Sequence, residues 1–301
     1  MGFAGLGRMG WPMAANVAGA GFPLRVFNRT RERAERFVGA VPGVEVCGTP
    51  AEMATVCNVV VTMLADGPAV DDVYLAEEGL IAGARPGTIF VDMSTIGPDH
   101  VAMLADKLGS LGLALVDAPV SGSVATATSG ELLVMAGGDP SVVQRVRPVL
   151  DAVGATVLYL GPSGAGATVK LVVNTVIYGL NQSVSEALVF AEVAGLDRLA
   201  TYEVFAHSAI AAPFVHYRRE AFERPGEVPV AFRVELASKD LRLILDLAGR
   251  VGADLPQAQT NLAILEETES SGLRDEDVSA VARYLRGKNR APPSRVPERG
   301  G

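Results

Sequence analysis

Short apolar runs alternate with helical stretches through the first half of the chain, and this alternation limits the fold more than any other feature. The runs are rich in β-branched and aromatic residues, and they read MGFAG, PLRVFN, VVVTML, TIFVDM, ALVDAP, LLVMAGG and ATVLYLG. Helical stretches lie between them, for example at 10–20, 31–39 and 98–111. Strands that alternate with helices at this spacing predict a parallel, doubly wound α/β sheet. We expect this domain to occupy residues 1–161.

The pattern changes after Gly164, where about thirty residues up to Gly195 have helical spacing and apolar side chains on nearly every face. Further helical segments follow without a convincing strand, near 197–207, 213–222, 230–250, 255–270 and 275–286. We therefore expect an all-α domain over 162–286, joined to the first domain by a long helix. Residues 287–301 contain Pro, Gly and charge but no apolar anchor, which predicts a disordered tail.

Composition narrows the class of protein and its partners. A long helix that is apolar all round favours burial against another subunit, so we expect a homodimer or a higher homo-oligomer. The apolar runs are interrupted before they reach bilayer length, and the net charge of −8 comes without a long basic cluster before the tail. Both features argue against membrane and nucleic-acid partners and favour a small molecule.

Targeting and metal signals are missing from the sequence. The strand pattern begins at Gly2, which leaves no room for a signal peptide and predicts a cytoplasmic protein. A misassigned start codon is another explanation for so short a first strand. The two cysteines have no neighbouring ligands at metal spacing, so we expect neither a disulfide framework nor a metal site.

A glycine-rich turn follows the first strand and precedes a helix; it consists of Gly5, Leu6, Gly7, Arg8, Met9 and Gly10. In this G-x-G-x-x-G spacing Gly5 permits the tight turn, Gly7 lets the backbone approach a pyrophosphate, and Gly10 lets the helix pack on the strand. The N-terminus of the helix then presents free N–H groups and a partial positive charge to the anion. The strand, turn and helix together predict dinucleotide binding.

The end of the second predicted strand indicates which dinucleotide is preferred. NAD-binding proteins carry an acidic residue there, which binds the ribose 2′-hydroxyl. This chain has Asn28, Arg29 and Thr30 and no carboxylate. The guanidinium of Arg29 suits a 2′-phosphate, and Asn28 or Thr30 can donate further hydrogen bonds. We expect NADP(H) as the cofactor, with NAD(H) as the alternative if Arg29 is only a solvated charge.

Lys170 and Asn174 lie four residues apart on the long predicted helix and so share one face. An unpaired ammonium is costly in apolar surroundings, so Lys170 either lies at a wet cleft or takes part in chemistry. It can protonate a carbonyl oxygen as a hydride arrives, while Asn174 orients the lysine or the substrate oxygen. The structural alternative is a snorkelling lysine beside a polar contact at a domain seam.

A second candidate for substrate binding follows the strand ALVDAP. Ser121, Gly122 and Ser123 offer hydroxyl groups and closely approaching backbone N–H groups, which can hold a carboxylate. Taken alone, such a segment is more often a simple turn.

Four motifs in order resemble the successive signatures of the β-hydroxyacid dehydrogenase family, and they are GFAGLGRMGWPMAANVAGAG, DAPVSGS, GPSGAGATVKLVVN and SKDLRL. The resemblance covers about 1–286. It implies a Rossmann domain, a long linking helix and a helical domain, with reversible oxidation of a short hydroxy acid by NAD(P) in the interdomain cleft. It also implies that Lys170 is catalytic, that Asn174 supports it, and that the 121–123 loop binds the substrate carboxylate. The residues it implies near the nicotinamide are Met63, Leu64, Ser94, Thr95, Phe232, Lys239 and Asp240.

Ser123 stands where most dehydrogenases of the family carry glycine. Together with NRT and VKLVVN, this departure is similar to the NADPH-dependent glyoxylate/succinic semialdehyde reductase branch. The expected substrates are of the 3-hydroxyisobutyrate, succinic semialdehyde or glyoxylate type. One alternative is an imine reductase of the same fold, a group that usually lacks lysine at the position of Lys170. The other is a non-catalytic dinucleotide-binding module, which need not keep Lys170, Asn174 and Ser121 together.

Overall fold

The computed structural model describes residues 1–289, and the chain forms two compact units. The N-terminal unit is Met1–Val173, and the helical unit begins at Asn174. The boundary falls inside one continuous helix, α9 (Ala165–Val193), which contributes to both units. Most of the predicted tail, 290–301, lies outside the described residues.

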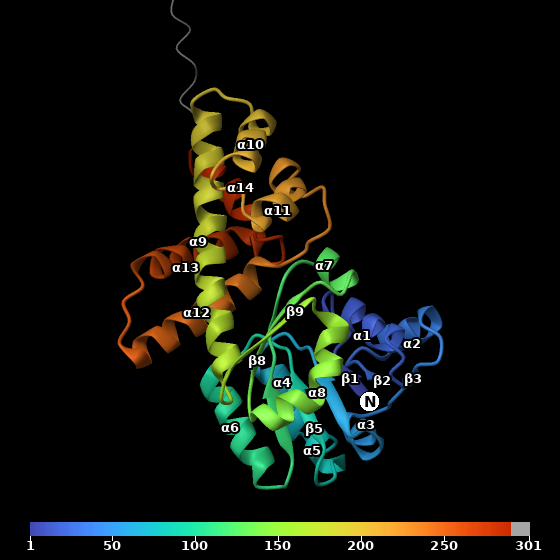
Figure 1. The fold of residues 1–301 in the computed structure, drawn as a ribbon. Helices are drawn as coiled ribbons and strands as arrows, with labels where there is room; N and C mark the ends of the chain where they lie inside the picture. Colours follow the sequence, from blue (N-terminus) through green and yellow to red (C-terminus); the bar gives the residue numbers. More distant parts are fainter. Residues whose placement is uncertain (290–301) are drawn as a thin grey trace, which may run out of the picture. The chain divides into compact units, whose positions relative to one another are not determined.

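The N-terminal unit is built on one nine-stranded sheet with the order β3-β2-β1-β4-β5-β6-β8-β7 and with β9 paired to β8 (Figure 1). Strands β1 to β6 are all parallel where they pair with one another. The strands are β1 (Gly2–Ala4), β2 (Arg25–Phe27), β3 (Glu45–Val46), β4 (Val59–Thr62), β5 (Ile89–Asp92), β6 (Ala114–Asp117), β7 (Val120–Ser121), β8 (Leu133–Gly137) and β9 (Thr156–Gly161).

The sheet departs from the predicted parallel arrangement at one side. β8 pairs antiparallel with both β6 and β7, so the sheet is mixed. A parallel return would need a crossover connection that usually carries a full helix. The residues between β6 and β8 instead form β7 and the short helix α7 (Val124–Thr128), and the chain turns back beside β6.

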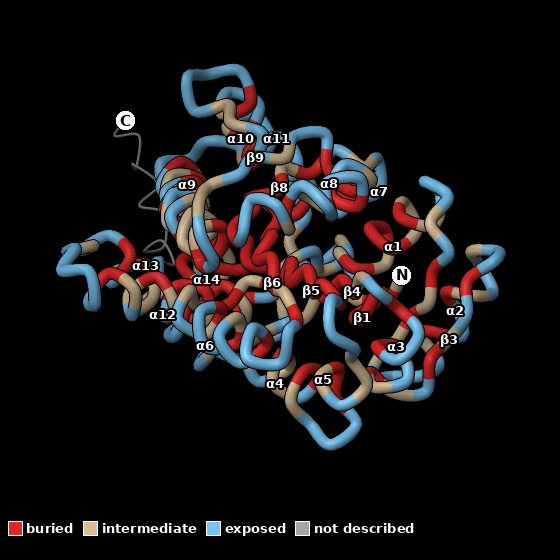
Figure 2. Tube along the Cα trace, turned by 60° about the horizontal axis from the view of Figure 1, so that its bottom comes forward, coloured by how far each residue is buried: buried red, intermediate tan, exposed pale blue. Residues whose placement is uncertain are grey.

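Helices cover both faces of the sheet, as the alternating sequence pattern predicts. Because successive side chains of a strand point to opposite faces, neighbours in β1 enter different cores. Phe3 packs in a cluster with Met13 and Phe37, whereas Ala4 packs in a cluster with Tyr74. Figure 2 shows the central strands as buried. The helices before α9 are α1 (Gly10–Gly19), α2 (Arg31–Ala40), α3 (Pro50–Val56), α4 (Gly67–Leu75), α5 (Leu80–Gly83), α6 (Pro98–Gly109), α7 and α8 (Pro140–Val153).

The described part of the helical unit, residues 174–289, contains the rest of α9 and five further α-helices. They are α10 (Arg198–His207), α11 (Pro213–Glu223), α12 (Val234–Val251), α13 (Pro256–Thr268) and α14 (Ala280–Lys288), with a π-helical turn at Glu269–Leu273. Within the described residues of this unit, the only β pairing is an isolated bridge between Arg233 and Asp277. The predicted order of a Rossmann domain followed by an all-α region is therefore confirmed.

The longest helix after α9 shows why these segments are helical. Buried apolar residues recur along α12 every three or four positions, at Ala237, Leu241, Ile244 and Ala248. The helix ends at Gly252, whose φ of +75° lies in the left-handed region that favours glycine. Over residues 1–289, no helix has both the length and the apolar character needed to cross a membrane.

Candidate active site

The glycine-rich turn is closed too tightly to admit side chains at two of its glycines. Gly5 has a φ of +100°, and a Cβ there would lie 2.3 Å from the carbonyl oxygen of Met63. A Cβ at Gly10 would lie 1.9 Å from the carbonyl oxygen of Gly5. A Cβ at Gly7 would meet no described atom within 4 Å, so the backbone faces open space there. This arrangement fits a turn that lets a pyrophosphate approach at Gly7.

The start of α1 also fits an anion. Met9 precedes the helix and makes no side-chain cap hydrogen bond to the described residues, and the first turn of α1 carries no acidic side chain. The first N–H groups of a helix lack intrahelical partners and carry a partial positive charge. A dinucleotide phosphate is a natural partner for them.

Asn28 connects the glycine-rich turn to the end of β2. Its side-chain oxygen accepts a hydrogen bond from the backbone N–H of Leu6 at 3.0 Å, and its Nδ2 donates to the carbonyl oxygen of Thr30 at 2.9 Å. Both ends of the Asn28 amide are therefore hydrogen-bonded to the backbone. Arg29 and Thr30 are exposed directly after β2, where we predict the contact with the 2′-phosphate.

A buried polar network joins the loops that follow β4 and β5. Thr62 and Ser94 donate from their hydroxyl groups to Oδ1 of Asp92, each at 2.7 Å. Ser94 Oγ in turn accepts the backbone N–H of Leu64 at 2.9 Å. Thr62 and Asp92 are paired at the carboxyl ends of the neighbouring parallel strands β4 and β5. These hydrogen bonds therefore fix the two loops that follow those strands. Four residues that we predict near the nicotinamide lie in these loops: Met63, Leu64, Ser94 and Thr95.

Asp92 gives this network a dependence on pH. Burial raises the pKa of Asp92 although Thr62 and Ser94 donate to it, and its Oδ2 has no hydrogen-bond partner among the described residues. The folded state thus favours the protonated acid. The stabilisation from Asp92 is fully present below the unfolded-state pKa of about 3.9 and is lost as the pH rises through the raised folded-state pKa.

We expect Asp92→Asn to become more stable relative to the wild type as the pH rises from about 4 to about 7. Urea unfolding of both proteins over that range measures the difference in the free energy of unfolding. Asp139→Asn is the matched control, because hydrogen bonds from Ser141 lower the pKa of the exposed Asp139; its contribution changes mainly below about pH 4, so its difference should stay nearly constant from about pH 4 to about pH 7. A difference for Asp92→Asn that does not vary with pH would contradict the prediction.

The 121–123 loop has a structural task at one of its serines. Ser123 Oγ accepts the backbone N–H of Thr126 at 3.3 Å, and Thr126 Oγ1 accepts the N–H of Ser123 at 2.7 Å, which forms a capping box at the start of α7. Gly122 has a φ of +150°, and a Cβ there would lie 2.4 Å from Thr126 Oγ1. Ser121 lies half-buried on β7. Binding of a substrate carboxylate by this loop stays a prediction.

The start of α9 is held by Asp117, which was not among the predicted site residues. Asp117, the last residue of β6, accepts backbone N–H groups from Gly164 and Ala167, each at 2.9 Å. A carboxylate at a helix N-terminus satisfies donors that have no intrahelical partner. Burial raises the pKa of Asp117, and these two hydrogen bonds oppose the rise. Asp117 thereby fixes the first turn of the helix that carries Lys170.

Asn174 belongs to a buried polar cluster in the helical unit. The side chain of Asn174 is only 5% exposed, and its Nδ2 donates to Oδ2 of Asp240 at 2.8 Å. Tyr178 donates its hydroxyl group to the same oxygen at 2.5 Å, and Lys239 Nζ lies 2.9 Å from Oδ1. The family resemblance already placed Lys239 and Asp240 near the nicotinamide, but Tyr178 was missed. Its signal in the sequence is the repeated spacing of four from Lys170 to Asn174 to Tyr178.

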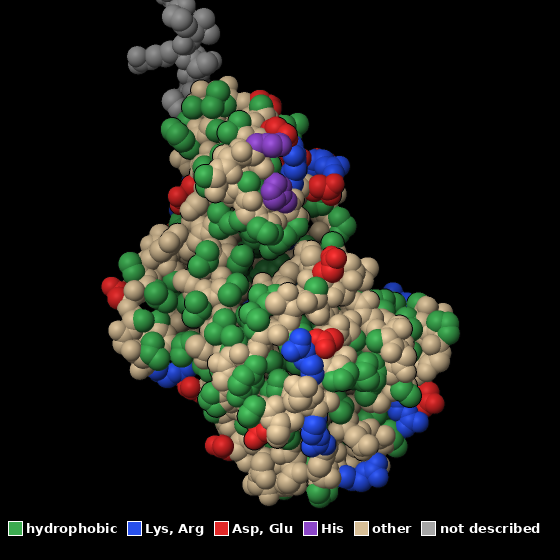
Figure 3. Space-filling model, in the orientation of Figure 1, with side chains coloured by type: hydrophobic (Ala, Val, Ile, Leu, Met, Phe, Trp, Pro, Cys, Tyr) green, Lys and Arg blue, Asp and Glu red, His purple; other side chains and the backbone are tan. Residues whose placement is uncertain are grey.

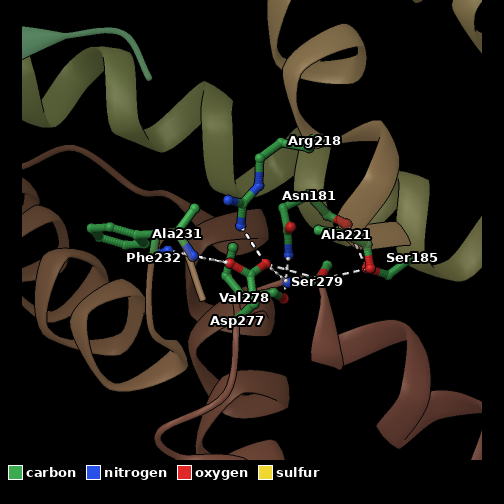
Figure 4. Close-up of polar contacts among 9 residues, drawn as sticks. All are labelled: Asn181, Ser185, Arg218, Ala221, Ala231, Phe232, Asp277, Val278 and Ser279. Carbon is green, nitrogen blue, oxygen red and sulfur yellow. Dashed lines mark hydrogen bonds and ion pairs between the residues drawn. The ribbon is translucent and has the colours of Figure 1, made fainter. Parts of the chain in front are cut away.

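Phe232 sits in a segment that is fixed by a buried ion pair. Asp277 Oδ2 accepts the backbone N–H groups of Ala231 and Phe232 at 2.9 and 3.2 Å, and Asp277 Oδ1 accepts from Arg218 at 2.6 Å (Figure 4). The ring of Phe232 stacks on that of Tyr178, with centroids 6.4 Å apart and planes 26° from parallel. The predicted cofactor residue Phe232 is therefore packed against the cluster that contains Asn174.

Two family descriptions together cover nearly all of the described chain. Residues 1–161 match the NAD binding domain of 6-phosphogluconate dehydrogenase. Residues 164–285 match the family described as NAD-binding of NADP-dependent 3-hydroxyisobutyrate dehydrogenase.

Individual proteins agree with these matches. The chain is 34% identical to the chloroplastic glyoxylate/succinic semialdehyde reductase 2 of Arabidopsis thaliana, over 95% of this chain and 79% of that protein. It is 31% identical to the cytokine-like nuclear factor N-PAC of Xenopus tropicalis over 94% of this chain, which spans about half (52%) of that protein. The crystal structure of 3-hydroxyisobutyrate dehydrogenase from Salmonella typhimurium superposes with a TM-score of 0.88 at 28% identity, covering 94% of this chain and 98% of that one. The chain therefore belongs to the β-hydroxyacid dehydrogenase family of NAD(P)-dependent oxidoreductases.

Proposed function

We propose that the protein is an NADPH-dependent reductase that converts a short aldehyde or keto acid bearing a carboxylate into the hydroxy acid, and that the reaction is reversible. The bound cofactor supplies the hydride. Lys170 donates a proton to the carbonyl oxygen, and in the reverse direction it accepts the hydroxyl proton. Ser121, Gly122 and Ser123 bind the substrate carboxylate through hydroxyl and backbone N–H groups.

The observation that carries this proposal is the buried amide of Asn174, one helical turn after Lys170 on α9. Its partner Asp240 also accepts from Tyr178 and lies against Lys239. Burying several polar and charged groups together costs free energy that apolar packing would avoid. Two members of this cluster, Asn174 and Tyr178, follow the candidate proton donor Lys170 by one and two turns of α9. Catalysis explains such a cluster better than stability does.

Two features support the cofactor and substrate class. The end of β2 offers the exposed guanidinium of Arg29 and no carboxylate between residues 28 and 30, which favours a 2′-phosphate. The plant relative at 34% identity is named as a glyoxylate/succinic semialdehyde reductase, which favours an aldehyde that carries an acid group.

The test is a substrate panel in which the consumption of NADPH is followed by absorbance. The panel contains succinic semialdehyde, glyoxylate, methylmalonate semialdehyde and a cyclic imine, and we expect turnover with at least one of the three carboxylates. Turnover of the cyclic imine alone would instead identify an imine reductase. The similarity to N-PAC, whose name is not that of an enzyme, keeps a non-catalytic dinucleotide-binding module as the second candidate. Binding of NADPH without reduction of any compound in the panel would support this second candidate.

We also propose that the protein is a homodimer or a higher homo-oligomer, located in the cytoplasm. Large apolar side chains stay exposed along α9 and α10, among them Phe190 at 75%, Val176 at 69% and Val204 at 64%. Figure 3 shows such side chains on the surface of the helical unit. Exposed apolar surface of this kind marks interaction sites, and a second copy of the same helix offers a matching apolar face.

Sedimentation velocity at micromolar concentration should therefore give at least the mass of a dimer. Phe190→Asp combined with Val176→Asp should shift the protein toward the monomer, because each charge would be buried in the interface. The exposed pair Asp99→Asn with Glu131→Gln serves as the control. A wild-type protein that sediments as a monomer would refute this assembly.

A further inference from the structure

We propose that Tyr178 is a positioning residue of the reductase, which fixes the orientation of the Asn174 amide through Asp240. The inference rests on the proposed function, since Asn174 supports the proton donor only in that function. The family motifs do not extend to Tyr178, and its only signal in the sequence is its spacing of four from Asn174 on α9.

Asn174 and Tyr178 share one acceptor atom. Asn174 Nδ2 and the hydroxyl of Tyr178 both donate to Oδ2 of Asp240, at 2.8 and 2.5 Å. Lys239 Nζ lies 2.9 Å from the other oxygen of the same carboxylate. Asp240 therefore accepts two hydrogen bonds at Oδ2, has the Lys239 ammonium as an ion-pair neighbour at Oδ1, and is almost fully buried. If Asp240 Oδ2 moved together with Asn174, its hydrogen bond from the Tyr178 hydroxyl would break.

Asp240 determines which end of the Asn174 amide faces it. A carboxylate only accepts hydrogen bonds, so Asn174 must turn its NH₂ group toward Asp240 and its carbonyl oxygen away from it. The oxygen is the end that can accept a hydrogen bond from an ammonium or from a substrate hydroxyl. A fixed Asp240 therefore holds the NH₂ group of Asn174 and leaves its carbonyl oxygen as the end available to the reacting groups.

Tyr178 itself has little freedom to move. Its side chain is buried, and its ring stacks on Phe232, whose backbone N–H is bonded to Asp277. Arg218 pairs with Asp277 from α11, so the support extends to a second helix (Figure 4). Burial and the nearby Asp240 raise the pKa of Tyr178 well above its usual value of about 10. The hydroxyl thus stays protonated and remains a donor at neutral pH.

Tyr178→Phe is the decisive variant, because it removes only the hydroxyl and keeps the ring that stacks on Phe232. We expect kcat for the best panel substrate to fall about tenfold or more, since a small misplacement near the reacting groups slows the chemical step. The Kd for NADPH should stay within about twofold, because the phosphate contacts predicted in the N-terminal unit are untouched.

Tyr202→Phe is the matched control. Tyr202 is also buried in the helical unit, and its hydroxyl donates to the carbonyl oxygen of Val215 at 2.8 Å, without any contact to Asp240 among the described residues. Both variants lose one buried tyrosine hydroxyl, so both should lose thermal stability, and Tyr178→Phe should lose more because its hydroxyl donates to a carboxylate. Only Tyr178→Phe should lower kcat. An unchanged kcat in Tyr178→Phe, or an equal fall in Tyr202→Phe, would overturn the proposal.

A spectroscopic measurement separates this inference from the proposed function. The side-chain amides of asparagine are labelled with ¹⁵N, and the signal of Asn174 is assigned by its loss in Asn174→Ala. This signal should shift in Tyr178→Phe and stay in place in Tyr202→Phe. If the wild type reduces no compound, the proposed function fails, and the signal alone decides whether Tyr178 orients Asn174. A signal that does not move in Tyr178→Phe overturns the inference whatever the activity.

Discussion

Lys170→Ala is expected to lower kcat by about 10² to 10⁴-fold, the range that general acid catalysis contributes. The alanine cannot deliver a proton to the carbonyl oxygen, so negative charge would develop there without neutralisation. The Kd for NADPH should change by less than about threefold, because the predicted phosphate contacts lie at the glycine-rich turn and at Arg29. Steady-state kinetics with the best panel substrate and a fluorescence titration with NADPH measure the two quantities.

Two further variants sharpen this test. Lys170→Arg keeps the positive charge but not a group that releases a proton near neutral pH, so it should remain nearly as slow as the alanine variant. Lys107→Ala removes an exposed lysine near the end of α6 and should leave kcat unchanged. A loss of NADPH affinity in Lys170→Ala that equals the loss in kcat would mean that the lysine is structural. Wild-type kcat in either Lys170 variant would exclude it as the proton donor.

The parts of the fold that follow local sequence patterns were predictable. The turn from Gly5 to Gly10 between a strand and a helix combines a backbone requirement with a periodic pattern, and both are visible in a single sequence. The long helix α9 was equally clear, because nearly thirty residues share one period. The direction of β8 was not, because β8 is buried along nearly its whole length, and a strand buried on both faces is apolar throughout whichever way it runs.

The residues that support the candidate site were harder to predict, since their partners are distant in the sequence. Asp117 bonds to backbone groups about fifty positions later, and Asp240 meets Asn174 from another helix. No period or motif encodes such pairs. Ser123 shows the opposite difficulty: a hydroxyl predicted for substrate binding caps α7, and the Thr126 that completes the capping box is not the usual Glu or Gln. A local structural task and a ligand contact use the same residue types.

Arg29→Glu is expected to weaken NADPH binding by about 100-fold and to leave NADH binding unchanged or slightly stronger. A charge-assisted hydrogen bond from arginine to phosphate contributes about 1.5–3 kcal/mol, and the new carboxylate also repels the 2′-phosphate. A loss of about 3 kcal/mol corresponds to roughly a hundredfold change in Kd. The same carboxylate can accept a hydrogen bond from the ribose 2′-hydroxyl of NADH, as the acid at this position does in NAD-binding proteins.

The control for Arg29→Glu is Arg36→Glu, which makes the same change in charge on the exposed surface of α2, away from the end of β2. Titrations of each protein with NADPH and NADH give four dissociation constants and two preference ratios. If both variants lose NADPH affinity equally, the loss comes from the change in net charge, and Arg29 does not contact the 2′-phosphate specifically. If Arg29→Glu keeps the wild-type ratio, the 2′-phosphate does not lie at this arginine. A reversed ratio in Arg29→Glu alone is the result that the geometry after β2 leads us to expect, because only there does an exposed guanidinium stand where NAD-binding proteins carry an acid.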